Sequence, residues 1–275
     1  MTRSLSNRAR LNNGVEIPYL GLGMYQIRQG IQARDAIRYA LEAGYRHIDT
    51  AKLYSNERDV GLAVRESRIP REEIFITTKL WNSDHGYDQA ITAFQESLMD
   101  LGLSYIDLYL IHWPVEQLRN QSWEALIALQ KAGKCRAIGV SNYTIRHLEE
   151  LLATSPIIPA VNQVEFSPFL YQQELLDFCR AQGIQLEAYS PLTRGKRFDH
   201  PVITSLATRY DKTPAQIMIR WALEHDIVVI PKSAHRDRIE ENADVFDFTI
   251  STRDLARLDS LNEDFRVDWD PTNVY

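Results

Sequence analysis

The feature that most restricts the fold is a strand-then-helix rhythm that repeats along the chain. Short runs rich in β-branched and aromatic residues end in polar residues, and stretches with helical periodicity follow them. The expected strands cover residues 20–23, 47–51, 74–80, 106–113, 135–142, 160–166, 185–192 and 227–233. The helical stretches include residues 31–43, 88–101, 122–132, 144–153, 172–182 and 214–225. Such alternation predicts a parallel sheet, and eight units favour a closed (β/α)8 TIM barrel over a doubly wound sheet.

The breaks between these stretches are turns rather than linkers, so residues 1–275 are expected to form a single domain. Glycines stand where four of the helices should end, at positions 44, 102, 133 and 183. An Asn-Gly step between alternating residues predicts an N-terminal β-hairpin at about residues 8–19. The last residues, about 264–275, are expected to form a C-terminal tail over the barrel rim.

The glycine pattern argues against the main alternative fold. A doubly wound sheet that binds a dinucleotide should carry G-x-G-x-x-G after its first strand. Gly21 and Gly23 begin this pattern, but Gln26 occupies the place of the third glycine. The Rossmann interpretation therefore fails on its own fingerprint.

Charge and cysteine content exclude several classes of partner. A net charge of −6 with both signs mixed argues against nucleic acid or an anionic membrane surface, and no apolar run is long enough to span a bilayer. Cys135 and Cys179 are too few for a disulfide framework and lack metal-ligand spacing. The opening MTRSLSNRAR lacks the apolar core of a secretory signal, although its Arg and Ser content faintly suggests a transit peptide. We expect a soluble cytoplasmic protein without a metal site, and a monomer because no helix face is unusually apolar.

Polar or aromatic side chains end the expected strands, at the edge where barrel enzymes carry their chemistry. They are Asp49, Lys79, His112 with Trp113, Ser141 with Asn142, Asn162 with Gln163, Tyr189 with Ser190, and Lys232 with Ser233. Each has an ordinary explanation when taken singly, since a strand-end Asp often caps a helix and a strand-end Lys is usually solvated. One site at one barrel mouth explains them all together.

A series of motifs resembles the aldo-keto reductase family. They are HIDTAKLYSNE (47–57), TTKLW (77–81), LIHWP (110–114), GVSNY (139–143), VNQVEF (161–166), YSPL (189–192) and IPKS (230–233) followed by RIEEN (238–242). They run in the family's order from about residue 10 to about residue 265, and together they are highly specific. The resemblance implies a (β/α)8 barrel that reduces aldehydes and ketones with NADPH. Short rim loops make the chain similar to compact prokaryotic members, such as 2,5-diketogluconate and glyoxal/methylglyoxal reductases.

The resemblance assigns a catalytic tetrad to Asp49, Tyr54, Lys79 and His112. Hydride arriving at a carbonyl carbon leaves negative charge on oxygen, which needs a proton. The Tyr54 hydroxyl can supply it, and the Lys79 cation is expected to lower its pKa toward neutrality. Asp49 is expected to keep Lys79 charged, and His112 to donate a hydrogen bond to the carbonyl oxygen. Lys52, the nearest amine in the sequence, is expected to be a bystander.

The hydride itself must come from a cofactor, because no side chain donates one. The resemblance implies NADPH/NADP+, with the carboxamide on Ser141, Asn142 and Gln163, the ring on Tyr189, the 2′-phosphate on Lys232, Ser233 and Arg238, and the adenine on Glu241 and Asn242. Further expected cofactor contacts are Gly23, Met24, Asp49, Ser190 and Leu192. Two cations and a hydroxyl beside a helix start suit a phosphate monoester, which favours NADPH over NADH.

Aromatic residues are expected to line the substrate pocket. They are Tyr25, Trp81 and Trp113 beside His112, with Trp269 of the tail as a weaker candidate. An apolar, aromatic cup suits small carbonyl compounds such as methylglyoxal, other 2-oxoaldehydes, aromatic aldehydes or keto-sugars. Ser167 departs from the family pattern, where many relatives carry histidine, and its contact with substrate or with the rim is open.

Two alternative functions use the same barrel. Lys79 could form a Schiff base, as in barrel aldolases, although this leaves Tyr54, Gln163 and the Lys232–Arg238 cluster without a role. A non-catalytic nucleotide-binding regulatory subunit is the other, and the intact tetrad argues against it. Borohydride trapping of a substrate adduct would support the aldolase, and NADPH binding without oxidation by carbonyl compounds would favour the regulatory subunit.

Overall fold

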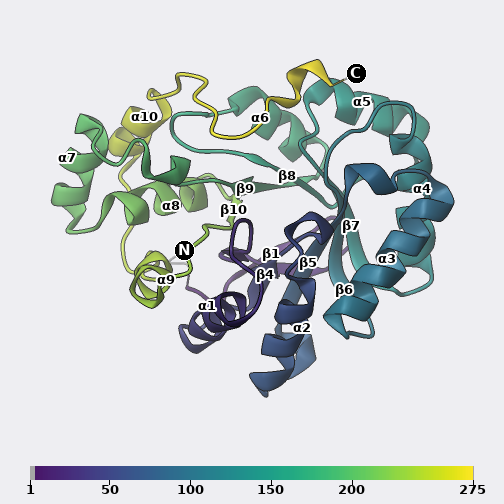
Figure 1. Ribbon diagram of the computed structural model, residues 1–275. Helices are drawn as coiled ribbons and strands as arrows, with labels where there is room; N and C mark the ends of the chain where they lie inside the picture. The colour runs from purple at the N-terminus through teal and green to yellow at the C-terminus, as the bar shows by residue number, and fades with distance from the viewer. Residues whose placement is uncertain (1–3, 275) are drawn as a thin grey trace.

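A central barrel of parallel strands organises the computed structural model, which describes residues 4–274 (Figure 1). Its strands follow one another around the sheet in sequence order: β3 (Leu22–Gly23), β4 (His47–Asp49), β5 (Phe75–Leu80), β6 (Ile106–Ile111), β7 (Cys135–Ser141), β8 (Val161–Glu165), β9 (Gln185–Tyr189) and β10 (Val228–Val229). Leu20 pairs in parallel with Val229, and the Gly21 N–H donates to the Val229 carbonyl at 2.9 Å. This pairing joins the first strand segment to the last and confirms the predicted barrel.

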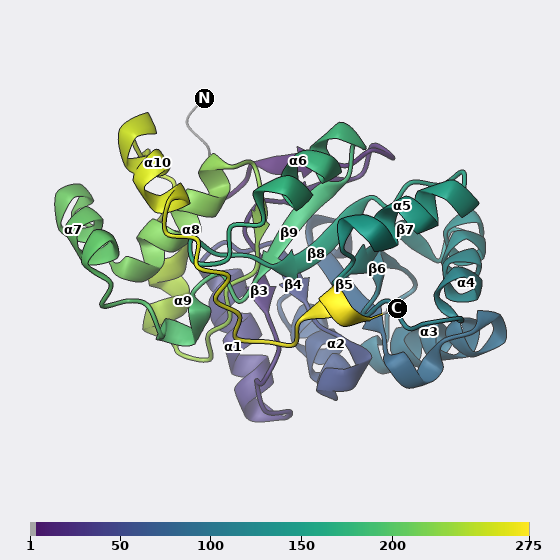
Figure 2. The same cartoon turned by 90° about the horizontal axis from the view of Figure 1, so that it is seen from above.

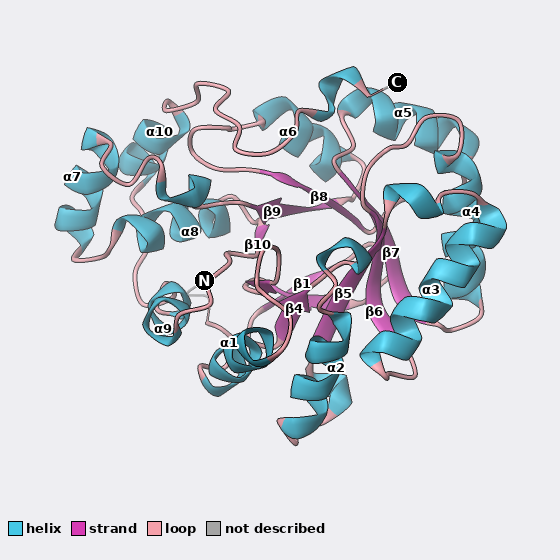
Figure 3. Cartoon of the chain, viewed as in Figure 1, coloured by secondary structure: helices cyan, strands magenta, loops and turns pink. Residues whose placement is uncertain are grey.

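Helices surround the strands, as Figure 3 shows in cyan around magenta. The helix after each strand in turn is α1 (Ile31–Glu42), α2 (Glu57–Glu66), α3 (Tyr87–Leu101), α4 (Arg119–Lys131), α5 (Ile145–Thr154), α6 (Gln173–Ala181), α8 (Pro214–Glu224) and α9 (Arg236–Ala243). Helices α7 (Pro201–Tyr210) and α10 (Thr252–Asp259) are additions to this pattern. The glycines at 44, 102, 133 and 183 have φ of +97°, +60°, +68° and +70°, the left-handed conformation of helix-ending glycines. Within residues 4–274, no helix is both long and apolar enough to cross a bilayer.

The predicted N-terminal hairpin closes one end of the barrel. Strands β1 (Arg8–Arg10) and β2 (Glu16–Pro18) pair antiparallel. Ile17 packs in a buried cluster with residues from the lower halves of the barrel strands, including Phe75 and Val161. The barrel interior is therefore sealed at the amino ends of its strands.

The strands are shorter than the sequence runs that predicted them, and the difference falls on their polar ends. β10 ends at Val229, because Pro231 has no N–H to donate and only its carbonyl accepts, from Gly23 at 3.1 Å. Asn142 and Ser190 have φ of +64° and +47°, which turns the chain out of the sheet. The polar residues that follow the strands, such as His112, Asn142 and Lys232, therefore lie in loops. The others, which are Asp49, Lys79, Ser141, Asn162, Gln163 and Tyr189, lie within the strands.

The C-terminal segment runs back across the barrel mouth, as seen in yellow in Figure 2. The Val267 and Asp268 N–H groups donate to the buried Glu165 carboxylate at 2.7 and 3.1 Å. Asp268 also pairs with Arg194 at 2.5 Å, and the Trp269 ring lies 5.6 Å from that of Trp113. This agrees with the predicted tail over the rim, whose last residue, 275, lies outside the described residues.

Candidate active site

A cavity of about 720 Å³ opens at the carboxyl ends of the barrel strands. The sequence-predicted residues that line it are Gly23, Tyr25, Asp49, Tyr54, Trp81, His112, Trp113, Ser141, Asn142, Gln163, Tyr189, Ser190, Leu192, Lys232, Ser233, Arg238, Glu241 and Asn242. Met24 and Lys79 do not line it: the Met24 side chain is fully buried in the core, and Lys79 is buried among the side chains behind the floor. One cavity thus gathers residues from nearly the whole length of the chain.

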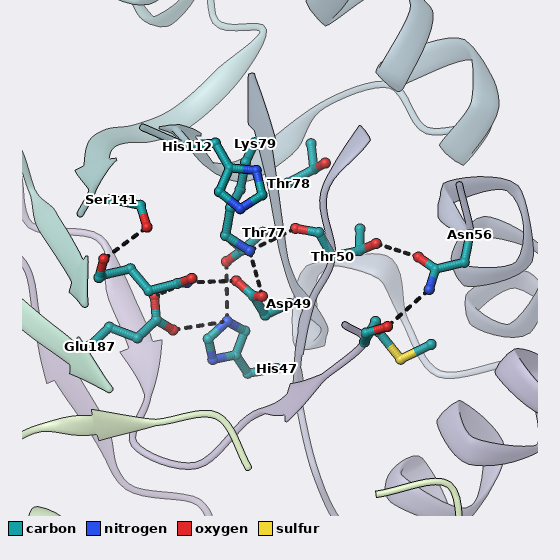
Figure 4. A network of polar contacts seen from close by, with 12 residues as sticks. His47, Asp49, Thr50, Asn56, Thr77, Thr78, Lys79, His112, Ser141 and Glu187 are labelled. Carbon is teal, nitrogen blue, oxygen red and sulfur yellow. Dashed lines mark hydrogen bonds and ion pairs between the residues drawn. The ribbon is translucent and has the colours of Figure 1, made fainter. Parts of the chain in front are cut away.

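A buried ion pair supports the floor of this cavity. Strands β4 and β5 are parallel neighbours, so the ends that carry Asp49 and Lys79 lie side by side. Lys79 Nζ donates to Asp49 Oδ1 at 2.6 Å and to the Thr50 carbonyl at 2.9 Å (Figure 4). Burial raises the pKa of the Asp49 carboxyl, and the Lys79 charge together with a hydrogen bond from Gln163 opposes that rise.

Tyr54 lies above this pair, at the end of the short 3₁₀ turn Lys52–Tyr54. Lys79 Nζ is 5.2 Å from the centroid of its ring. Burial raises the pKa of the Tyr54 phenol well above its usual value, and the Asp49 charge adds to this. The direction is opposite to the expected lowering, because both burial and the Asp49 charge disfavour phenolate. Tyr54 is therefore a protonated phenol at neutral pH, the form that an acid catalyst requires.

His112 contributes a neutral imidazole to the cavity. Burial and the Lys79 charge lower the pKa of His112 well below its usual value. Its ring packs edge-on against Trp81 at 5.2 Å and against Tyr54 at 5.7 Å, while Nδ1 is buried without a hydrogen-bond partner within residues 4–274. A neutral ring retains one N–H donor. His112 can therefore orient a carbonyl oxygen beside Tyr54.

Hydrogen bonds fix the amide and hydroxyl groups at the middle of the cavity. Asn142 Nδ2 donates to the His112 carbonyl at 2.9 Å, and Asn142 Oδ1 accepts from the Tyr189 hydroxyl at 2.8 Å. Ser141 Oγ donates to the Gln163 carbonyl at 2.8 Å. These bonds explain how Asn142 is held in its left-handed backbone conformation. Preorganised polar groups beside an aromatic ring fit a nicotinamide.

Two cations lie at the other end of the cavity. Neither Lys232 nor Arg238, in the first turn of α9, forms an ion pair with any residue between 4 and 274. Burial and the Arg238 charge lower the pKa of Lys232. The Ser233 hydroxyl lies close by and accepts from the His235 N–H at 3.1 Å. Two like charges without a carboxylate partner suit a phosphate monoester.

The structure also places Lys52, the expected bystander, and Ser167, whose contact the sequence left open. Lys52 does not line the cavity, and its ammonium pairs with Glu96 at 2.6 Å and Asp84 at 3.1 Å. Ser167 does not line the cavity, and its hydroxyl accepts from the Phe169 N–H at 3.2 Å, so its role is packing at the rim.

The pair Arg194–Asp268 lines the cavity, as does Trp269, but no sequence motif indicates that pair, since its members are 74 residues apart. Among residues 4–274, no group of three or more His, Cys, Asp or Glu side chains could hold a metal ion.

Comparison with known proteins identifies the family to which this site belongs. The profile of the Aldo/keto reductase family matches residues 19–263. The chain is an aldo-keto reductase. It is 50% identical to the glyoxal reductase of Bacillus subtilis (strain 168) over 274 residues, which cover 100% of this chain and 99% of that protein.

Solved aldo-keto reductase structures agree with this assignment. One from a Medee basin deep-sea metagenome library superposes with a TM-score of 0.95 at 46% identity, covering 97% of this chain and 99% of that one. The Bombyx mori aldo-keto reductase in complex with NADP gives a TM-score of 0.91 at 37% identity, covering 97% and 96%. The predicted family is confirmed.

Proposed function

We propose that this aldo-keto reductase reduces small aldehydes and ketones to alcohols with NADPH, using Tyr54 as the general acid. The observation that carries the proposal is the geometry: the Tyr54 and His112 rings lie 5.7 Å apart, between centroids, beside a buried Lys79–Asp49 pair. Burial raises the pKa of the Tyr54 phenol and lowers that of the His112 imidazole, which favours the neutral form of both. Bound NADPH supplies the hydride. Tyr54 gives its proton to the carbonyl oxygen, and His112 donates a hydrogen bond that orients this oxygen. Lys79 then stabilises the phenolate that remains.

The preference for NADPH rests on Lys232, Ser233 and Arg238. Two cations at one end of the cavity can pair with the 2′-phosphate of NADPH. NADH has an uncharged hydroxyl at that position, which forms no ion pair with them. The Bombyx mori relative was solved with NADP, which agrees with this choice. Comparable catalytic efficiency with both nucleotides contradicts it.

The substrate class follows from the aromatic mouth. Tyr25, Trp81 and Trp113 line the cavity beside His112, and the exposed Trp269 extends this lining onto the tail. Together with the glyoxal reductase relative, this favours 2-oxoaldehydes such as methylglyoxal, followed by aromatic aldehydes and keto-sugars. Cys135 and Cys179 are buried free thiols, which suits the proposed reducing cytoplasm. We expect a monomer by size-exclusion chromatography.

A Schiff-base aldolase is disfavoured on physical grounds. The Lys79 side chain is fully buried, bonded to Asp49, and outside the cavity lining. Schiff-base formation requires a neutral amine that reaches the substrate carbonyl, and the Asp49 carboxylate favours the ammonium instead.

The decisive experiment compares wild type with Tyr54→Phe. We expect wild type to oxidise NADPH with methylglyoxal or 4-nitrobenzaldehyde, and Tyr54→Phe to lose roughly 10²–10⁴-fold in turnover, the usual worth of a general acid. Tyr54→Phe should still bind NADPH, which quenching of tryptophan fluorescence can measure. If Tyr54→Phe keeps more than about a tenth of wild-type turnover, Tyr54 is not the acid. Binding without oxidation across a carbonyl panel favours the regulatory-subunit alternative.

A further inference from the structure

A layer of buried polar side chains supports the cavity floor from below (Figure 4). The Gln163 side-chain amide donates from its single Nε2 to Asp49 Oδ2 at 2.7 Å and to Glu187 Oε2 at 2.8 Å. The ionised Asp49 carboxylate, paired with Lys79, only accepts, so its contact determines which end of the amide is nitrogen. Gln163 lines the cavity, and its amide oxygen is left as the acceptor available there.

Glu187 is the deepest acid of this layer. Its side chain is fully buried in β9 and does not line the cavity. Glu187 Oε1 accepts no hydrogen bond within residues 4–274 and lies 3.6 Å from His47 Nε2, which is 3.1 Å from the Thr77 hydroxyl. Burial and the Lys79 charge lower the pKa of His47 to about 3. The His47 ring is therefore neutral and supplies no counter-charge.

The remaining charged or titratable groups near Glu187 lie on strands that are not paired with β9. Strand β4 presents His47 and Asp49, and β5 presents Lys79. Of the two strands paired with β9, β8 contributes the Gln163 amide and β10 has only Val228 and Val229. Lys79 is already paired with Asp49. If Glu187 were also ionised, two buried carboxylates would share the single Lys79 cation. Burial and the Asp49 charge accordingly raise the pKa of Glu187 to about 8.

We propose that Glu187 is a positioning residue of the active site, which fixes the Gln163 amide with its oxygen toward the cavity and sets the charge of the floor by holding or releasing a proton. This rests on the proposed function, because the group that would sense both effects is the nicotinamide. The floor is neutral while Glu187 holds its proton and gains one negative charge when the proton leaves. That charge favours the cationic ring of NADP+ over the neutral ring of NADPH.

The test is the ratio of the two dissociation constants, NADP+ over NADPH, as a function of pH. It needs no carbonyl substrate, and ionisation of the 2′-phosphate common to both ligands largely cancels. Between about pH 6.5 and about pH 9.5 we expect the wild-type ratio to fall on the order of 10-fold, from Coulomb's law for unit charges about 10 Å apart at an effective dielectric of about 20. Glu187→Gln keeps the size and an acceptor oxygen but holds no titrating proton, so its ratio should stay constant.

A second variant tests whether Glu187 keeps the Gln163 amide in its orientation. Glu187→Leu removes the acceptor, so NADPH and NADP+ should both bind about 10-fold more weakly, the usual worth of one hydrogen bond to a charged or buried partner. Binding of 2′-phospho-ADP-ribose, which lacks the nicotinamide, should be unchanged. Glu57→Gln is the matched control: Glu57 is also buried with a raised pKa, but it accepts from Thr78 and Ser97 outside the cavity. It should behave as wild type.

The outcomes separate this inference from the proposed function. A wild-type ratio that does not change with pH, or that changes equally in Glu187→Gln, overturns the inference while dinucleotide binding stands. Equal weakening of NADPH and 2′-phospho-ADP-ribose in Glu187→Leu reduces Glu187 to a structural role. If Glu187→Leu does not fold, the pH dependence of Glu187→Gln decides alone. Wild type that binds neither dinucleotide overturns the proposed function and this inference with it.

Discussion

Replacing Lys79 by methionine separates the structural role of the buried ion pair from its role in turnover. The variant keeps a side chain of similar length but leaves the Asp49 carboxylate buried without its cation. Lys79 is fully buried and Asp49 nearly so, and both Nζ bonds, to Asp49 Oδ1 and the Thr50 carbonyl, are lost. Breaking a buried pair by removing one partner typically costs about 3–5 kcal/mol. For a chain of this size that corresponds to a fall of roughly 10 °C in the melting temperature.

The stability lost in Lys79→Met should also depend on pH. Without Lys79, burial holds the folded-state pKa of Asp49 above its unfolded value of about 3.9. Between these two values the folded state binds more protons than the unfolded state, so its stability falls as pH rises. The deficit of Lys79→Met should therefore be larger at about pH 8 than at about pH 5.

The measurement is urea unfolding followed by circular dichroism, with the midpoint compared at constant slope. The double variant Lys79→Met with Asp49→Asn removes the orphan charge, so it should be about 2–3 kcal/mol more stable than the sum of the single changes predicts. Lys52→Met is the control; its partners Glu96 and Asp84 are partly exposed, so it should cost less than about 1 kcal/mol and leave turnover nearly intact. Additive costs, or equal effects of the two lysine changes, refute the argument.

Three further changes test other parts of the molecule. Arg238→Ala should raise the KM for NADPH about 10–100-fold and leave that for NADH unchanged, as steady-state kinetics can establish. Gly61→Ala should destabilise the protein by about 3 kcal/mol or more in urea unfolding, because a Cβ at this position would lie 1.8 Å from the Leu101 carbonyl oxygen; an unchanged midpoint contradicts this packing. Burial opposes ionisation of Asp254, but hydrogen bonds from Arg209 and neighbouring groups outweigh it and hold its pKa well below the usual range. The stability that Asp254 contributes is present above its unfolded pKa of about 3.9 and lost as pH falls through its folded value, so the gap between wild type and Asp254→Asn should narrow in acid.

Much of the barrel could be predicted because its signals are local. Helical periodicity and terminal glycines predicted helices such as α3 to within one residue. The strand-end positions converge because parallel strands of a barrel present their carboxyl ends at one mouth. Topology alone therefore brought Asp49, Gln163 and Lys232 to one cavity from strands far apart in the sequence.

The missed features depend on contacts that no local pattern carries. Glu187 lies inside a strand run, where a single acid gives no sign that it points into the barrel rather than to solvent. Asp268 meets Arg194 only because the tail folds back across the mouth. The pKa of Tyr54 was predicted in the wrong direction, because the sequence indicates the nearby cation but not the depth of burial that outweighs it.

The hairpin β1–β2 closes the barrel at the amino ends of its strands. Ile17 packs with Phe75 and Val161 where a channel would otherwise emerge. Solvent can therefore reach the barrel interior only from the cavity at the carboxyl ends of the strands. A ligand bound in that cavity shields the buried Lys79 and Glu187 from bulk water. Proton exchange between these two residues and solvent should then depend on whether the cavity is occupied.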